Sequence, residues 1–123
     1  MKFKPGRQGS GYSVLTLFKS KLLQRDAYII KYPTGSAIPA HKDPVPEGYV
    51  HWRLNIVLPT KHTGGDFYYL YPENPNNTYL IYSKTSWFGL KIIKFAPSEI
   101  THSVSEVISG TRYVLSFGWL KKR

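Results

Sequence analysis

Two histidines and one aspartate have the residue types and the spacing of a metal site. His41 and Asp43 are two residues apart, and side chains in a β-strand alternate between faces, so the pair would project together from a strand. His102 supplies a second imidazole later in the chain. Two imidazoles and one carboxylate leave the opposite positions of an ion open, which is the arrangement that non-haem Fe(II) uses to bind a co-substrate and dioxygen. The chain has no cysteine, so the usual zinc frameworks are excluded, and a closed zinc site would need a further histidine or carboxylate.

Arg112, ten residues after His102, is a candidate anchor for a carboxylate. We expect the intervening segment to form a hairpin, with strands at residues 101–104 and 111–119 and residues 109–110 in the connection. A planar guanidinium carries a fixed fork of donors, so an arginine on the second strand can bind a carboxylate in bidentate fashion.

Each of these features also has a plain structural interpretation. A His-x-Asp pair is common in surface loops, and a single arginine is more often solvated or paired than a ligand clamp. The whole combination nevertheless favours a metal site. His51, at the start of a predicted strand, and His62, in a Gly-containing loop, are interpreted as exposed or structural residues.

The order of the motifs resembles that of a known enzyme family. The chain presents His41-x-Asp43, then Gly64-Gly65-Asp66-Phe67, then the segment from His102 to Arg112, and finally Leu115-Ser116-Phe117-Gly118-Trp119. This order resembles the Fe(II)/2-oxoglutarate-dependent oxygenase superfamily, most closely its prolyl 4-hydroxylase-like branch. The resemblance runs from about residue 28 to residue 119, which is most of the chain.

The resemblance implies a dioxygenase that hydroxylates a C–H bond and converts 2-oxoglutarate to succinate. His41, Asp43 and His102 would hold Fe(II), and 2-oxoglutarate and O2 would be co-substrates, with ascorbate as a candidate addition. Arg112 would bind the distal carboxylate of 2-oxoglutarate. The substrate that this branch suggests is a protein or peptide side chain.

Three further residues are candidates for the co-substrate site. Tyr32 lies near where related enzymes place a tyrosine that binds 2-oxoglutarate, and a packing role fits it equally well. Ser116 is four residues after Arg112 and therefore on the same face of that strand, where an ordinary polar strand residue is the alternative. Asn55 shares a strand face with Arg53. The prolyl hydroxylase pattern has a Thr and a Tyr on this central strand, and this departure leaves the substrate open.

The pattern of the chain predicts an all-β fold. Short apolar segments rich in aromatic residues are separated by Gly and Pro, which is typical of short strands. Predicted strands span residues 27–32, 36–41, 52–58, 66–70, 78–82, 89–95, 101–104 and 111–119. Residues 12–23 are interpreted as a further strand, although the spacing of their apolar residues also fits a helix. Eight or so antiparallel strands without a long helix indicate a double-stranded β-helix, or jelly roll.

The length predicts one small domain. The 123 residues suffice for a single core, and we expect a basic N-terminal supporting segment at 1–25, a catalytic core at 26–119 and a basic tail at 120–123. Substrate-facing loops are expected at 44–49, at 71–77 and in the N-terminal segment. Neither a signal peptide nor a membrane-spanning apolar run is recognised, so the protein is expected to be cytoplasmic, without membrane contact, and a monomer or homodimer.

The formal net charge of +10 bears on the choice of partner. A basic surface attracts polyanions, so an acidic protein and a nucleic acid are both candidate substrates, although charged termini also promote solubility. Nucleic-acid dealkylating members of the superfamily carry a second arginine six residues after the first, and this chain has none there. A protein or peptide substrate therefore leads.

Two other classes of protein stay open. The first is a metal-free basic β-domain that binds nucleic acid by stacking bases on exposed Tyr68, Tyr69, Tyr71 or Trp87. The second is a cupin-like metal enzyme that uses the same triad without 2-oxoglutarate, and Arg112 argues against it.

Overall fold

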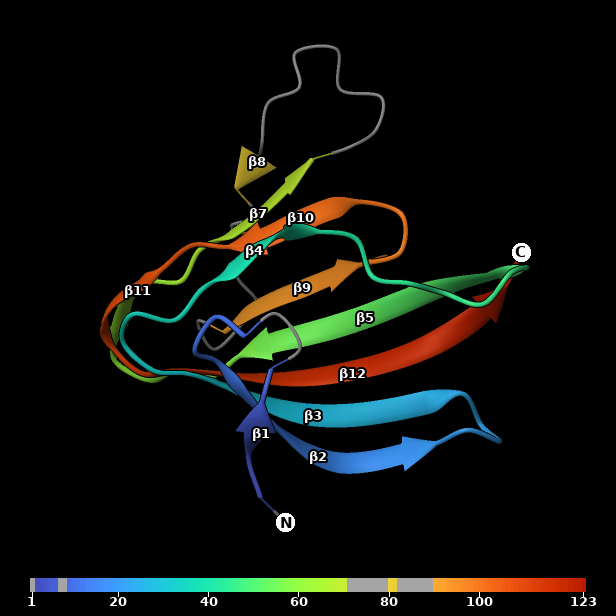
Figure 1. Cartoon of the computed structure of the whole chain (residues 1–123), viewed down its shortest axis with the longest axis horizontal. Coiled ribbons are helices and arrows are strands. Elements are labelled where there is room, and N and C mark those ends of the chain that lie inside the picture. The colour runs from blue at the N-terminus through green and yellow to red at the C-terminus, as the bar shows by residue number, and fades with distance from the viewer. Residues whose placement is uncertain (1, 7–8, 71–79, 82–89) are drawn as a thin grey trace.

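The chain folds into antiparallel β-sheets (Figure 1). The computed structural model describes residues 2–6, 9–70, 80–81 and 90–123. Within these ranges every regular element is a strand, and no helix has the length and apolar character that crossing a membrane requires. The prediction of a small all-β jelly roll is therefore confirmed.

The larger sheet has six strands in the order β1-β2-β3-β12-β5-β9. They are β1 (Lys4–Pro5), β2 (Ser13–Ser20), β3 (Arg25–Tyr32), β5 (Tyr49–Val57), β9 (Lys91–Phe95) and β12 (Arg112–Lys122). β12 pairs with β3 on one side and with β5 on the other. Buried and more exposed residues alternate along β12 from Arg112 to Gly118, so one face of this sheet is turned inward.

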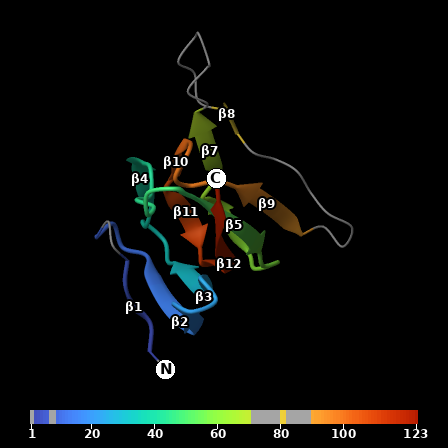
Figure 2. The same cartoon turned by 90° about the vertical axis from the view of Figure 1, so that its right-hand side faces the viewer.

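The second sheet has four strands in the order β4-β10-β7-β8. They are β4 (Ile38–His41), β7 (Phe67–Leu70), β8 (Leu80–Ile81) and β10 (Thr101–Val104). A two-stranded sheet of β6 (His62–Gly64) and β11 (Val107–Gly110) lies at one end of the molecule, at the left in Figure 1. In Figure 2, β4, β10 and β7 stand above β3, β12 and β5.

The hydrophobic core joins the two main sheets. Tyr32, Val57 and Val114 of the larger sheet and Phe67 and Val104 of the smaller one belong to a single buried cluster. Removing these apolar side chains from water is the main driving force for the fold. Because the inward residues alternate with outward ones along each strand, polar side chains at the same inward positions face the interior between the sheets.

The predicted hairpin between His102 and Arg112 is wrong. β10 pairs with β4 and β7, whereas β12 pairs with β3 and β5, so the two strands belong to different sheets. β11 lies between them in the chain and pairs with β6. The pattern of apolar and polar residues predicts a strand, but it does not specify the partner strand. The partner depends on contacts between residues that are far apart in the sequence.

Several boundaries also differ from the predicted ones. Asp43 lies in the loop after β4 and not on a strand, because β4 ends at His41 and Pro44 cannot donate to a strand ladder. His62 begins β6 and is not in a loop. β12 runs to Lys122, so residues 120–122 extend the central strand. Only residues 80–81 of the predicted strand 78–82 are described, and the predicted loop 71–77 lies outside the described residues.

Candidate metal centre

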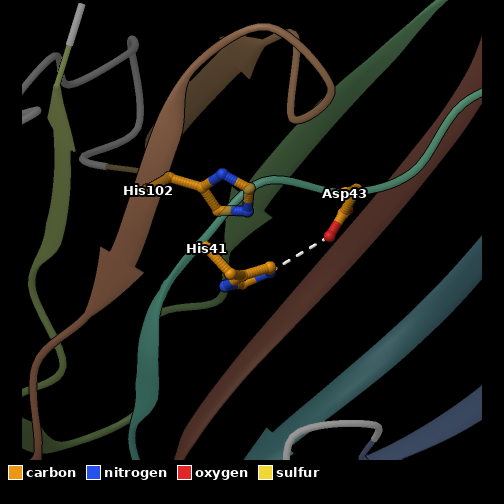
Figure 3. A group of neighbouring side chains, drawn as sticks. All are labelled: His41, Asp43 and His102. Carbon is orange, nitrogen blue, oxygen red and sulfur yellow. Dashed lines mark ion pairs between the residues drawn. The ribbon is translucent and has the colours of Figure 1, made fainter.

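Three candidate metal ligands converge between the sheets (Figure 3). His41 is the last residue of β4, and His102 lies directly opposite it on β10. Their ring centroids are 4.4 Å apart. The ligand atoms of His41, Asp43 and His102 all lie within 4.8 Å of one another. The register of the β4–β10 pair thus brings together side chains that are far apart in the sequence.

A short loop holds Asp43 beside the two imidazoles. Its backbone N–H donates to the carbonyl oxygen of Pro97 at 2.8 Å, which ties the loop to the segment before β10. Its carboxylate oxygen Oδ1 is 3.0 Å from Nε2 of His41. The two side chains are therefore adjacent, as expected, although one comes from a strand and the other from a loop.

Backbone carbonyl groups orient both imidazoles. Nδ1 of His41 is 2.7 Å from the Pro39 oxygen, and Nδ1 of His102 is 3.1 Å from the Ile100 oxygen. A carbonyl oxygen only accepts hydrogen bonds, so each Nδ1 carries a proton and donates it. In a neutral imidazole the free lone pair then lies on Nε2 and is available to a metal ion. Nε2 of His41 therefore lies beside the carboxylate of Asp43, so a nitrogen ligand and an oxygen ligand are available to the same cation.

His102 occupies the most enclosed position of the three ligands. It is 6% exposed and lies against two aromatic rings, with centroid distances of 5.1 Å to Phe95 and 6.0 Å to Phe67. Burial lowers the pKa of His102, against the opposing effect of the hydrogen bond to the Ile100 carbonyl. The imidazole is therefore neutral at neutral pH, which is the form that binds a metal.

Arg112 has a buried guanidinium group with an unused donor. The residue is 4% exposed, and its Nη1 has no hydrogen-bond partner among the described residues. Its Cζ lies 4.7 Å from the centroid of the Tyr32 ring. Buried polar groups are nearly always hydrogen-bonded, and an unpaired buried cation is costly. This environment therefore suits an anionic ligand such as a carboxylate.

Gly65 and Tyr32 shape the space around Arg112. A Cβ atom at Gly65 would lie 2.7 Å from Cδ of Arg112, and Gly65 has a φ of +68°, which favours glycine. The Gly-Gly-Asp-Phe motif therefore makes room for the arginine as well as forming a turn. Tyr32 is 2% exposed and stacks on Tyr12 with a centroid distance of 5.8 Å. Burial raises the pKa of Tyr32, against the opposing charge of Arg112, so its hydroxyl stays protonated.

A single cavity of about 380 Å³ connects the metal ligands with Arg112. Its volume is in the range of small-molecule sites. The residues that the sequence proposed for the site all line it: His41, Asp43, His102, Arg112, Tyr32, Ser116 and Asn55. The structure therefore brings together every residue of the predicted site.

A second polar cluster, centred on Arg53, also lines this cavity. Arg53 is 8% exposed and donates from Nη2 to Oδ1 of Asp26 at 2.6 Å and from Nε to Oγ of Ser116 at 2.8 Å. The Ser116 hydroxyl donates in turn to Oδ1 of Asn55 at 2.5 Å. Nη1 of Arg53 lies 3.1 Å from Nε2 of His51. Each of the three guanidinium nitrogens of Arg53 therefore has a partner within the chain.

Strand register explains this second cluster. Asp26, Gly118 and Arg53 form one row across β3, β12 and β5. A Cβ atom at Gly118 would overlap the Arg53 guanidinium, so this glycine provides the space for it. In the sequence, the position of Arg53 and Asn55 on one strand face was the available signal for this cluster. No sequence signal indicated Asp26 as the partner of Arg53, because their proximity depends on pairing between distant strands.

The remaining histidines and tyrosines depart in part from expectation. His51 is half-buried in β5 and lines the cavity, whereas His62 lies in β6 and does not line it. Tyr68 and Tyr69 are half-buried and not exposed. Tyr71 and Trp87, the other two candidates for base stacking, lie outside the described residues.

Comparison with solved structures identifies the fold. The structure is similar to a prolyl-4-hydroxylase from Pseudomonas putida, with a TM-score of 0.70 and 15% sequence identity over 99% of this chain and 78% of that chain. It is also similar to an oxidoreductase of the 2OG-Fe(II) oxygenase family from Burkholderia pseudomallei, with a TM-score of 0.62 and 17% identity over 90% of this chain and 45% of that chain. An oxalate oxidase in complex with glycolate matches with a TM-score of 0.55 and 15% identity, over 94% of this chain and 55% of that chain.

Cupin domains share this fold as well. The cupin domain of Schizosaccharomyces pombe Cnp3 matches with a TM-score of 0.56 and 12% identity, over 98% of this chain and 69% of that chain. No protein-family model matches the sequence, and no curated protein matches it significantly. The fold and the His-Asp-His cluster together define a jelly-roll protein with a candidate metal centre, in a fold that oxygenases, oxidases and cupin-domain regulators share.

Proposed function

We propose that the protein is an Fe(II)- and 2-oxoglutarate-dependent dioxygenase that hydroxylates a C–H bond of a protein or peptide side chain. One observation carries the proposal: a single cavity contains both a His-Asp-His cluster and a buried arginine whose Nη1 has no partner among the described residues. The cluster suits a divalent metal, and the arginine suits a carboxylate.

His41, Asp43 and His102 are the residues that would hold Fe(II). Both imidazoles have Nδ1 committed to a backbone carbonyl group, so their Nε2 atoms are the metal ligands. Two nitrogens and one carboxylate leave room in the coordination shell for exogenous ligands. When bound, Fe(II) with 2-oxoglutarate and O2 supplies the oxidising power for hydroxylation, and 2-oxoglutarate leaves as succinate and carbon dioxide.

Arg112 and Tyr32 are the residues that would hold the distal carboxylate of 2-oxoglutarate. The Nη1 group of Arg112 offers a charged donor, and the protonated hydroxyl of Tyr32 offers a neutral one. Ser116 and Asn55 already bond to each other, and Ser116 also accepts from Arg53. A contact of Ser116 or Asn55 with the co-substrate stays a prediction, and the network around Arg53 fixes where both side chains point.

Apolar side chains limit the access of water to His102, whereas the side chains of His41 and Asp43 are 20% and 18% exposed. Phe67, Phe95 and Val104 are buried around His102 and line the cavity with it. A dry environment strengthens the electrostatic interactions of the bound carboxylate and protects a strong oxidant from side reactions. The fold therefore suits oxidative chemistry at a single position near the metal.

Anaerobic addition of Fe(II) and 2-oxoglutarate tests the proposal directly. A chelated complex of the two should give a weak visible charge-transfer band, and His41→Ala should abolish it. His62→Ala is the matched control, since it removes a histidine that does not line the cavity, and it should keep the band. Absence of the band from the folded wild-type protein would overturn the proposal.

A metal-dependent enzyme that does not use 2-oxoglutarate is the second candidate. The His-Asp-His cluster alone would serve it, and this fold is shared with an oxalate oxidase. Nη1 of Arg112, which has no partner in the part of the chain that the structure describes, favours the first candidate. Iron binding that 2-oxoglutarate does not alter, either in the spectrum or in affinity, would support the second one.

A nucleic acid is the alternative ligand. The positive net charge favours it, whereas Tyr68 and Tyr69 are half-buried and offer less surface for stacking than expected. Release of succinate measured with candidate peptides and with oligonucleotides separates the two classes of substrate.

A further inference from the structure

A second, open groove continues the cavity at one end of the molecule. It has a volume of about 470 Å³ and lies among the β2–β3 turn, the loop before β5 and the last part of β12. All three segments lie on the right-hand side in Figure 1. Asp26 and His51 line both the groove and the cavity, so the two spaces adjoin.

Backbone hydrogen bonds fix the walls of this groove. The N–H of Leu120 donates to the Gln24 carbonyl at 3.2 Å, which ties the β2–β3 turn to β12. The N–H of Arg123 donates to the Gly48 carbonyl at 2.9 Å, which ties the end of β12 to the loop before β5. The groove is therefore formed in advance, and a ligand would lose little free energy in ordering it.

The groove carries a positive charge that the chain does not neutralise. Lys19, Lys21 and Arg25 line it and are exposed, and none of them forms an ion pair within the described part of the chain. Asp26 is the only acidic residue among the described lining residues, and it is already paired with Arg53 at 2.6 Å. We propose that this groove binds an acidic peptide segment and presents one of its side chains to the cavity.

The chemistry of the lining favours a peptide over a single-stranded nucleic acid. Nucleic-acid grooves combine cations with aromatic rings on which successive bases stack. Among the described residues that line this groove, Trp119 is the only Phe, Tyr or Trp, and Lys94 already lies 5.9 Å from its ring centroid. Pro44 and Pro46 supply rigid apolar contacts that suit an extended peptide. Three cations beside prolines therefore match a segment rich in Asp or Glu.

This inference deepens the proposed function, and only its link to hydroxylation rests on that function. The metal ligands and Arg112 do not line the groove, so peptide binding is independent of iron and of 2-oxoglutarate. A segment lying in the groove would pass Asp26 and His51 to reach the metal centre. Charge in the groove would thus select the sequence that flanks the reactive residue.

Fluorescence anisotropy with a labelled oligoglutamate peptide tests the inference on the full chain without metal. The variant K19E/K21E/R25E reverses the three groove cations and should weaken binding about tenfold or more. The matched variant K2E/K4E/K61E makes the same change of net charge with exposed lysines that do not line the groove, and its affinity should stay within about twofold of the wild type. K19Q/K21Q/R25Q should fall between the wild type and the charge reversal. Thermal melting checks that all variants are folded.

Two further measurements make the outcome decisive. Equal weakening in the groove and control variants, or no binding by the wild type, would overturn the inference. The inference would also be overturned if K19E/K21E/R25E weakened the binding of a labelled oligothymidylate more than it weakened the binding of the peptide. K19E/K21E/R25E should keep the visible band with Fe(II) and 2-oxoglutarate. If the wild-type protein binds the peptide but gives no visible band with Fe(II) and 2-oxoglutarate, the groove remains a peptide-binding site and only the proposed dioxygenase chemistry is refuted.

Discussion

Replacing Arg112 by methionine separates ligand binding from stability. In the absence of a ligand, Arg112 is a buried cation that contacts the ring of Tyr32, and its Nη1 has no hydrogen-bond partner within residues 2–6, 9–70, 80–81 and 90–123. Burial of an unsatisfied polar donor costs about 1–3 kcal/mol, and a cation–π contact gains about 0.5–2 kcal/mol. These contributions have opposite signs, so Arg112→Met should change the free energy of unfolding by less than about 1 kcal/mol.

The same substitution should strongly weaken the binding of 2-oxoglutarate. Removing one partner of a buried, hydrogen-bonded charge pair costs about 2–5 kcal/mol. Since about 1.4 kcal/mol changes a dissociation constant tenfold, the Kd for 2-oxoglutarate should rise between about 30-fold and 4,000-fold. Arg112→Lys keeps the charge but loses the fork of donors, so its Kd should lie between those of the wild type and Arg112→Met.

Anaerobic titration of the Fe(II) protein with 2-oxoglutarate measures this affinity, and thermal melting without ligand measures stability. Arg53→Met is the matched control in the same cavity, because Arg53 is paired with Asp26, whose side chain is 21% exposed. Breaking this partly buried pair should cost about 2 kcal/mol of stability, with a smaller effect on the Kd. Binding of 2-oxoglutarate by Arg112→Met within about threefold of the wild type would refute the assignment of Arg112 as the carboxylate anchor.

Three other expectations concern single residues. His102→Ala should abolish the metal-induced rise in Tm, which in the wild type corresponds to about 2.7 kcal/mol when free metal is about 100 times its Kd; an equal rise in the variant would contradict its role as a ligand. Burial raises the pKa of Tyr32 above 10.0, so its contribution to stability is complete below that pH and is lost as the pH rises through the folded pKa. An ultraviolet titration should show a late-ionising tyrosine that Tyr32→Phe removes. Gly65→Ala and Gly35→Ala both place alanine at positive φ and should each cost about 1–2 kcal/mol, but only the former meets Arg112 and should weaken 2-oxoglutarate binding.

The arrangement of strands could be predicted only in part. The apolar segments at 27–32 and 52–58, each followed by a proline, located β3 and β5 within a few residues, because these patterns are local. Partner choice is not local, so the pairing of β10 with β4 and β7 instead of β12 could not be read from the pattern. β11 was missed for the same reason, since its partner β6 lies more than forty residues away.

The candidate site was more predictable than the pairing that builds it. His41 and Asp43 are neighbours in sequence, and His102 and Arg112 were assigned through motif order, so neither step needed the sheet topology. The Arg53–Asp26 pair differs, because its two residues meet only through the register of three strands. Residues that act through such long-range pairing carry no short motif.

The two histidines lie opposite each other on β4 and β10, so their proximity depends on the register of these strands. Sliding either strand by a single residue would send one imidazole to the far side of its sheet, where it could no longer reach the other. A metal ion bound by both imidazoles would link β4 to β10 and would stabilise the register in which they face each other. Under the proposed function, iron binding would therefore stabilise this register over one that is shifted by a residue.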